Sequence, residues 1–131
     1  MIQAGEDVNE QNGSGFTPLH EASMNGHVEV VNILIQARVE VNCKTEKGNT
    51  PLHQASWKGH VEVVNRLIEA GGEVNNKDVD GLTPLHDASR HGHVEVITAL
   101  LAAGAVKTLK DKHGRTPHDV AKNQDCMDPS E

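Results

Sequence analysis

Large aromatic side chains are almost absent from this sequence of 131 residues. It has one tryptophan, one phenylalanine and no tyrosine, although 36% of its residues are hydrophobic. A single closed core of this length would normally recruit more rings. A stack of small units needs only Leu, Val, Ile and Ala, because each unit buries its apolar face against the next. The shortage of rings therefore favours a repetitive architecture.

Cysteine is also scarce, with Cys43 and Cys126 far apart and outside any CxxC or Cys/His ligand spacing. Two such residues cannot build a zinc framework, and nothing indicates a disulfide scaffold. We therefore expect no metal, no cofactor and an intracellular location, in the cytoplasm or the nucleus. No apolar run approaches membrane-spanning length and no signal-peptide pattern opens the chain, so no membrane partner is expected.

Positive charge is in short supply too, with 12 Lys and Arg against 19 Asp and Glu and a net charge of −7. Binding to nucleic acid irrespective of sequence needs a basic face that displaces counterions. The charge balance argues against such a partner and mildly favours a basic one, although solubility alone explains it.

Four related segments are present at one fixed spacing of 33 residues, beginning at Thr17, Thr50, Thr83 and Thr116. The first three read Thr-Pro-Leu-His, and the fourth reads Thr-Pro-His-Asp. A constant period of this size is typical of stacked repeats. Such a stack has a long concave surface and no built-in catalytic pocket, which favours binding of another macromolecule.

Each repeat predicts a turn, a short helix, a tight loop and a longer helix. In the third, Thr83 stands where a helix N-cap belongs, and Pro84 stands at the first helical position, where its missing N–H costs nothing. Gly92 is expected to end that helix. Apolar residues at three- and four-residue spacing predict the second helix, namely Val94, Ile97, Leu100 and Leu101.

These motifs resemble the ankyrin-repeat family. The pattern TPLHxA is intact three times, from Thr17 to Ala22, from Thr50 to Ala55 and from Thr83 to Ala88. A Gly-His-Val-Glu-Val segment follows each copy, and Val-Asn pairs stand at 8–9, 41–42 and 74–75. The resemblance implies an all-α, right-handed ankyrin-repeat solenoid of helix-turn-helix units with short β-hairpin loops.

The resemblance covers nearly the whole chain and implies one ankyrin-repeat domain, 1–131. Its predicted parts are the tail of a preceding repeat at 1–11, full repeats at 12–44, 45–77 and 78–110, and a degenerate or truncated repeat at 111–131. Arg38 departs from the pattern, because Gly71 and Gly104 end the other second helices. If the backbone there is left-handed, a residue other than glycine costs about 1 kcal/mol.

Histidine is abundant, and six of the nine occupy two repeat positions: His20, His53 and His86, and His27, His60 and His93. Equivalent histidines should lie about 10 Å apart in stacked helices, which is too far for one metal ion. We therefore expect hydrogen bonds to neighbouring loops, as the resemblance also implies. No nucleophile elbow, P-loop or dinucleotide fingerprint is present, so the chain is not expected to be an enzyme.

The expected function is that of a protein–protein interaction module, a scaffold or adaptor whose concave groove holds a partner peptide or surface. Residues that vary at fixed repeat positions should set specificity, because packing does not dictate them. The expected contacts are Phe16, Glu21, Met24, Asn25, Trp57, Lys58, Leu82, Asp87, Arg90 and His91. Glu21, Gln54 and Asp87 share one repeat position and form an acidic and polar line. The domain is expected to be a monomer.

Three alternatives stay open. The groove could accept basic peptides such as histone tails, since some nuclear ankyrin domains use an acidic and aromatic groove. The chain could instead be a structural spacer that binds nothing, or a segment that targets an enzyme lying outside it.

The resemblance also implies a modification site. Asparagines of ankyrin Val-Asn pairs can be substrates of an asparaginyl hydroxylase that prefers an upstream leucine and an acidic residue two positions before. Asn42 follows Leu34 and Glu40, and Asn75 follows Leu67 and Glu73. Both asparagines are therefore candidates for hydroxylation.

Overall fold

The computed structural model describes residues 15–121, which contain helices and no strand. Six helices alternate between a first and a second type: α1 (Pro18–Met24), α2 (Val28–Gln36), α3 (Pro51–Lys58), α4 (Val61–Glu69), α5 (Pro84–Arg90) and α6 (Val94–Ala102). A further helical stretch at 117–121 ends the described part. The predicted repeat tail at 1–11, the end of the degenerate repeat and Cys126 lie outside the described residues.

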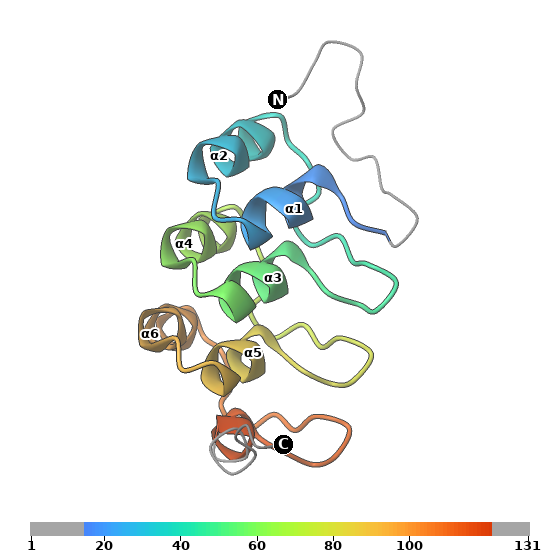
Figure 1. Ribbon diagram of the computed structural model, residues 1–131, viewed down its shortest axis with the longest axis vertical. Coiled ribbons are helices and arrows are strands. Elements are labelled where there is room, and N and C mark those ends of the chain that lie inside the picture. The colour runs from blue at the N-terminus through green and yellow to red at the C-terminus, as the bar shows by residue number, and fades with distance from the viewer. Residues whose placement is uncertain (1–14, 122–131) are drawn as a thin grey trace.

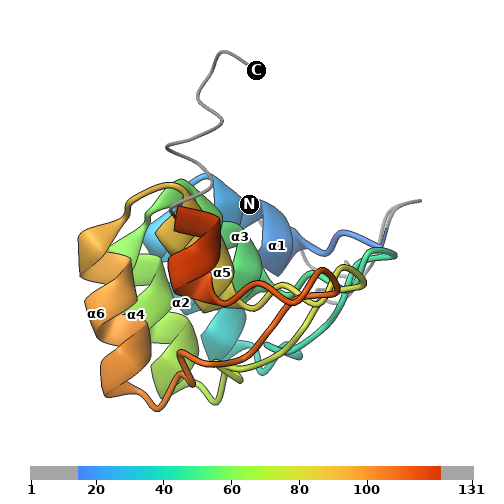
Figure 2. The same ribbon diagram turned by 90° about the horizontal axis from the view of Figure 1, so that it is seen from below.

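The helices form two columns, with α1, α3 and α5 in one and α2, α4 and α6 in the other (Figure 1). Each helix packs against its neighbours in the same column and against its partner in the other. Seen along the stack, the loops project together beyond the column of first helices (Figure 2). This confirms the all-α repeat stack expected from the sequence.

Every first helix begins with the same pair of reciprocal hydrogen bonds. The N-caps are Thr17, Thr50 and Thr83, and each accepts a hydrogen bond from the backbone N–H of the histidine three residues later. In return, Nδ1 of that histidine accepts a hydrogen bond from the threonine N–H, at 3.2, 3.1 and 3.1 Å in the three repeats. The motif Thr-Pro-Leu-His therefore encodes a complete helix start.

The same histidines join one repeat to the next. His20 Nε2 lies 2.8 Å from the carbonyl oxygen of Asn49, and His53 and His86 make the equivalent bonds of 2.9 and 2.8 Å to Leu82 and Arg115. Because Nδ1 accepts from the threonine N–H, the ring proton lies on Nε2 and is donated to the carbonyl. This confirms the expected hydrogen bonding between repeats.

The core runs between the two columns and is built from aliphatic side chains. Leu19, Leu52 and Leu85 stand at one repeat position, and none is more than 2% exposed. Second helices contribute fully buried Val31, Val64, Leu34, Leu67 and Leu100. Small branched side chains thus suffice, because each faces only the adjacent repeat.

The loops contain the turn of the expected hairpins but no β-ladder within residues 15–121. In the loop before α3 two backbone bonds close the turn, from Thr45 N–H to the Asn49 carbonyl and from Gly48 N–H to the Thr45 carbonyl, both at 2.9 Å. The side chain of Thr45 adds two more, since its Oγ1 accepts from the N–H groups of Lys47 and Asn49. Backbone groups at the loop tip pair instead with the next loop, as Val79 N–H does with the Lys47 carbonyl at 2.9 Å.

Arg38 adopts the left-handed backbone that the sequence comparison of the repeats suggested. Its φ is 64°, and the equivalent Gly71 and Gly104 have φ of 101° and 102°. Arg38 is the one residue other than glycine with a positive φ in the range 15–121. The first repeat therefore carries strain at the end of its second helix.

The last described helix begins with a modified version of the same cap. Asp119 stands where the other units have histidine, and its Oδ2 accepts from Thr116 N–H at 3.1 Å while Thr116 Oγ1 accepts from Asp119 N–H at 3.2 Å. An ionised carboxylate has no proton to donate to a carbonyl, so it cannot make the link that histidine makes to a following unit.

Candidate partner-binding site

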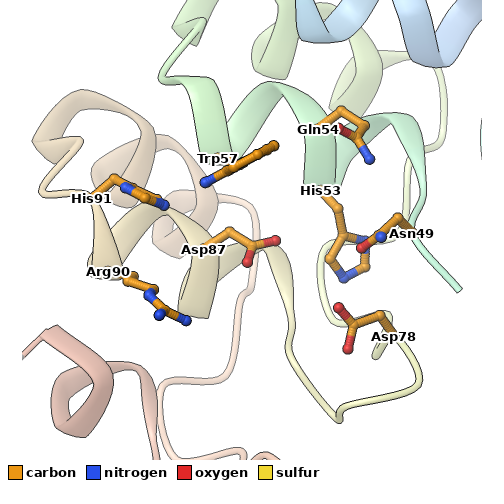
Figure 3. Close-up of a pocket in the computed structure, with 8 residues that line it drawn as sticks. All are labelled: Asn49, His53, Gln54, Trp57, Asp78, Asp87, Arg90 and His91. Atoms are coloured by element: carbon orange, nitrogen blue, oxygen red, sulfur yellow. The ribbon is translucent and has the colours of Figure 1, made fainter. Parts of the chain in front are cut away.

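A cavity of about 380 Å³ lies between α3 and α5, beside the loops that precede these helices. Its walls come from two adjacent first helices and from the loops that precede them. The lining residues are Asn49, His53, Gln54, Trp57, Asp78, Asp87, Arg90 and His91 (Figure 3).

Four of the ten residues expected to contact a partner line this cavity: Trp57, Asp87, Arg90 and His91. Trp57 stands near the end of α3, and the other three lie on α5 or at its C-cap. They meet because α3 and α5 pack side by side.

Trp57 forms the aromatic part of the cavity wall, and neighbouring side chains hold it in place. Trp57 is 43% exposed, and the ring of His91 lies 5.9 Å from its ring between centroids. His93 Nε2 lies 2.9 Å from the Trp57 carbonyl oxygen, which ties the end of α3 to the following repeat. Lys58 Nζ lies 5.0 Å from the indole centroid, a cation–π distance that covers part of the ring.

Two polar side chains from equivalent repeat positions face the cavity without hydrogen-bonding partners among the described residues. Gln54 is only 6% exposed. Asp87 is half-buried, and Figure 3 shows its carboxylate pointing from α5 toward α3. Burial raises the pKa of Asp87 well above its ordinary value, and the nearby Asp78 raises it further while Arg90 opposes the shift.

Asp78 lines the cavity and also stabilises the loop before α5. Its Oδ1 accepts hydrogen bonds of 2.9 Å from the N–H groups of Asp80 and Leu82, which fixes the loop before α5. At the opposite edge, burial lowers the pKa of His91, and the charges of His93, Arg90 and Lys58 lower it further. The imidazole is therefore neutral at physiological pH, and this uncharged ring stacks on His93 and packs at a tilt against Trp57.

The expected contacts of the first repeat lie on and beside α1, one repeat away from the cavity. Phe16 packs on His20, with ring centroids 5.3 Å apart. The Met24 carbonyl accepts from His60 Nε2 at 3.0 Å, and Asn25 Nδ2 donates to the Glu21 carbonyl at 3.0 Å. Glu21 and Asn25 are exposed, while Phe16 and Met24 are half-buried. Their contact with a partner stays a prediction.

The remaining two expected contacts flank the cavity without lining it. Lys58 covers the tryptophan ring, and the Leu82 carbonyl accepts the hydrogen bond from His53. Asn49, His53, Gln54 and Asp78 line the cavity but were not among the expected contacts. The repeat alignment held a signal for two of them, because Gln54 shares its position with Asp87, and Asn49 precedes the capping threonine as Leu82 does.

The two candidate hydroxylation sites hold neighbouring loops together. Asn42 Nδ2 donates to the Gly71 carbonyl at 3.1 Å, and its Oδ1 accepts from Glu73 N–H at 2.8 Å. Asn75 repeats both bonds to Gly104 and Val106, at 3.2 and 2.8 Å. The asparagines thus have a structural role, and their hydroxylation stays a prediction.

Other kinds of site have no counterpart in residues 15–121. No three His, Cys, Asp or Glu side chains come close enough there to hold a metal ion. Within the same stretch no helix has the length and apolar character needed to cross a membrane.

Comparison with known proteins agrees with the fold of stacked helix pairs. A family model described as ankyrin repeats (3 copies) matches residues 1–78, and one described as ankyrin repeats (many copies) matches residues 58–101. The first match alone spans more than half of the 131 residues. Among curated proteins no match was found. The family matches, together with the stacked helix pairs and their histidine links, show that the chain belongs to the ankyrin-repeat family.

Proposed function

We propose that this chain binds a partner protein through the cavity between α3 and α5, which receives a peptide segment or a protruding surface of the partner. Ankyrin repeats are in general protein–protein interaction modules and typically have no enzymatic activity. The observation that carries the proposal is Trp57, the only tryptophan of the chain, 43% exposed at the wall of a cavity.

The fold does not require a tryptophan at this position. The equivalent residues of the other repeats are Met24 and Arg90, at the ends of α1 and α5. All three helices have the same start and the same links, so a large ring on α3 is not dictated by packing. Tryptophan beside a hollow is one of the residue types that most often anchor an interface.

A wider contact surface follows from the same geometry. A partner segment that continues along the stack from the cavity toward α1 would reach Glu21, Met24 and Asn25, and then Phe16. Lys58 and Leu82 lie beside that course. These residues complete the proposed contact surface with the four predicted residues that line the cavity.

The proposal is tested by the effect of Trp57→Ala on partner capture and affinity. Proteins captured from a lysate by the wild-type chain are compared with those captured by Trp57→Ala and by Ile33→Ala. Ile33 is also apolar and 50% exposed, but it lies on α2 and does not line the cavity. We expect Trp57→Ala to weaken binding of the identified partner by more than about 1 kcal/mol, and Ile33→Ala to leave it unchanged.

Equal affinity of wild type and Trp57→Ala for the same partner would reject the assignment of this cavity. Absence of any partner that distinguishes the two would favour the alternatives in which the groove binds nothing, a structural spacer or a segment that targets an enzyme lying outside the chain.

A further inference from the structure

We propose that the inner wall of this cavity, formed by Gln54 and Asp87, accepts the basic side chain of a lysine or arginine in the bound peptide segment. The proposal rests on the proposed function and adds the chemistry of what is bound. Both residues occupy the position that follows the Thr-Pro-Leu-His motif, on adjacent helices.

Gln54 is the first observation. The residue is only 6% exposed and lines the cavity, and its side chain has no hydrogen-bonding partner among residues 15–121. The unpaired side-chain atoms that are fully shut off from solvent in residues 15–121 belong to Ser23, Ser56 and Asn76, so the amide of Gln54 still reaches the open space of the cavity. The His53 ring, also buried on α3, has both polar atoms engaged. The amide of Gln54 is therefore available to a group that enters the cavity.

Asp87 is the second observation. Its side chain makes neither a hydrogen bond nor an ion pair within the described residues, and it points into the same space (Figure 3). The main reason for its raised pKa is the loss of water around the carboxylate. A cation that enters the cavity would replace that lost solvation, and the amide oxygen of Gln54 would share in binding it.

The surrounding charges favour a cation at the inner wall. From the loop before α5, Asp78 adds a second carboxylate, while on α3 burial lowers the pKa of His53 and keeps its ring neutral. From α5, Arg90 and His91 stand at the cavity edge, and Arg90 is exposed. An acidic ligand side chain would meet Asp78 and Asp87 at the inner wall. A basic one would compete with Arg90 for them, and Lys44 and Lys58 add positive charge near His53 and His91.

This arrangement couples binding to protonation. A bound ammonium or guanidinium group favours the ionised form of Asp87, so binding should release a proton from that carboxyl. Affinity for a basic peptide should therefore rise with pH over the range in which free Asp87 titrates. Protonation of His91 at lower pH would repel the ligand and act in the same direction, so a variant of each residue is needed.

The experiment uses short peptides selected from a random display library on the full chain. Their binding is followed through the fluorescence anisotropy of a dye attached to the peptide, so that wild type and Trp57→Ala are compared by the same measurement. We expect the selected peptides to share a lysine or arginine, and replacement of that residue by glutamine to weaken binding at least tenfold.

Three variants then locate the basic side chain. Asp87→Asn should weaken binding at least tenfold and flatten the pH dependence, whereas His91→Asn should leave the contribution of Asp87 to that dependence in place. Arg90→Gln should strengthen binding several-fold, because it removes the competing cation. Glu62→Gln removes one exposed negative charge from α4 and serves as the control, with unchanged affinity expected.

The outcomes separate this proposal from the previous one. Peptides whose binding needs Trp57 but which have no shared basic residue, or which bind Asp87→Asn equally well, would overturn the assignment of the inner wall and leave the proposed function standing. If no selected peptide depends on Trp57, both proposals fail. Circular dichroism of each variant establishes that it is folded before its affinity is compared.

Discussion

Arg38 occupies a position for which its side chain is poorly suited. The left-handed backbone, with φ of 64°, brings Cβ of any side chain close to the peptide group, and only glycine avoids this. Arg38→Gly should therefore raise the free energy of unfolding by about 1 kcal/mol, as measured by urea denaturation.

The matched control is the reverse change in the next repeat. A Cβ on Gly71 would meet no atom within 4 Å, so Gly71→Ala alters the backbone preference and nothing else. It should lower the free energy of unfolding by about the same 1 kcal/mol. If Arg38→Gly is destabilising while Gly71→Ala behaves as stated, Arg38 makes a favourable contact that outweighs its strain.

Individual residues also show what could and could not be predicted from the sequence. The histidine hydrogen bonds and the strain at Arg38 were predictable, because both depend on one repeat position and a known backbone geometry. The burial of Gln54 and Asp87 was not, because it depends on how closely α3 and α5 approach. The placement of Lys58 over Trp57 depends on a side-chain rotamer, which a repeat pattern does not specify.

At the scale of helices and loops, the capping histidines make stability depend on pH. Burial is the main cause that lowers the pKa of His20, His53 and His86 below the ordinary 6.5. The unfolded chain then binds more protons than the folded one as the pH falls below about 6.5, so acid favours unfolding. The urea midpoint should drop between about pH 7.5 and pH 5.5.

Asp87 changes the stability of the fold with pH in the opposite direction, so its contribution must be separated from that of the histidines. Its raised pKa gives stability that is present at low pH and lost as pH rises. The measurement is therefore best made in Asp87→Asn as well as in wild type, and the acid-induced drop should be at least as large in the variant. A midpoint that is constant in both would show that the buried histidines do not titrate differently on unfolding.

The loop asparagines provide a chemical prediction at the same scale. Incubation with an asparaginyl hydroxylase should add oxygen at Asn42 and Asn75, detected as a mass increase and located by peptide sequencing. Both side-chain amides are engaged by the next loop, so the enzyme must reach them by local opening of that loop. Asn42→Ala and Asn75→Ala variants should each lose one addition, and an unmodified wild-type chain would end the hypothesis.

At the scale of the whole molecule, stability is transmitted from neighbour to neighbour. Leu52 is 1% exposed on α3, which packs against α1 on one side and α5 on the other. Leu52→Ala should lower the free energy of unfolding by about 2–5 kcal/mol. Hydrogen exchange should show that amides of α1 and α5 lose protection together with those of α3. Loss confined to α3 would mean that the units unfold independently.

The architecture of the stack could be predicted almost entirely from the sequence, because one 33-residue pattern specifies both a helix pair and its joint to the next. The cavity could be predicted only in part. Trp57, Asp87, Arg90 and His91 were expected as contacts, but the hollow belongs to two repeats at once. A pattern within one repeat does not describe the space between two, so residues such as Asp78 were missed.

The histidine links have a consequence for how such a chain can be rebuilt. His20, His53 and His86 each bond to a main-chain oxygen 29 residues further on, belonging to Asn49, Leu82 and Arg115 in turn. Three different side chains at the accepting position leave the bond length within 0.1 Å, because a carbonyl is common to every amino acid. Repeats that share this hydrogen bond should therefore be exchangeable. A library of repeats can vary the residues of the groove while the histidine-to-carbonyl bond between neighbouring repeats stays the same.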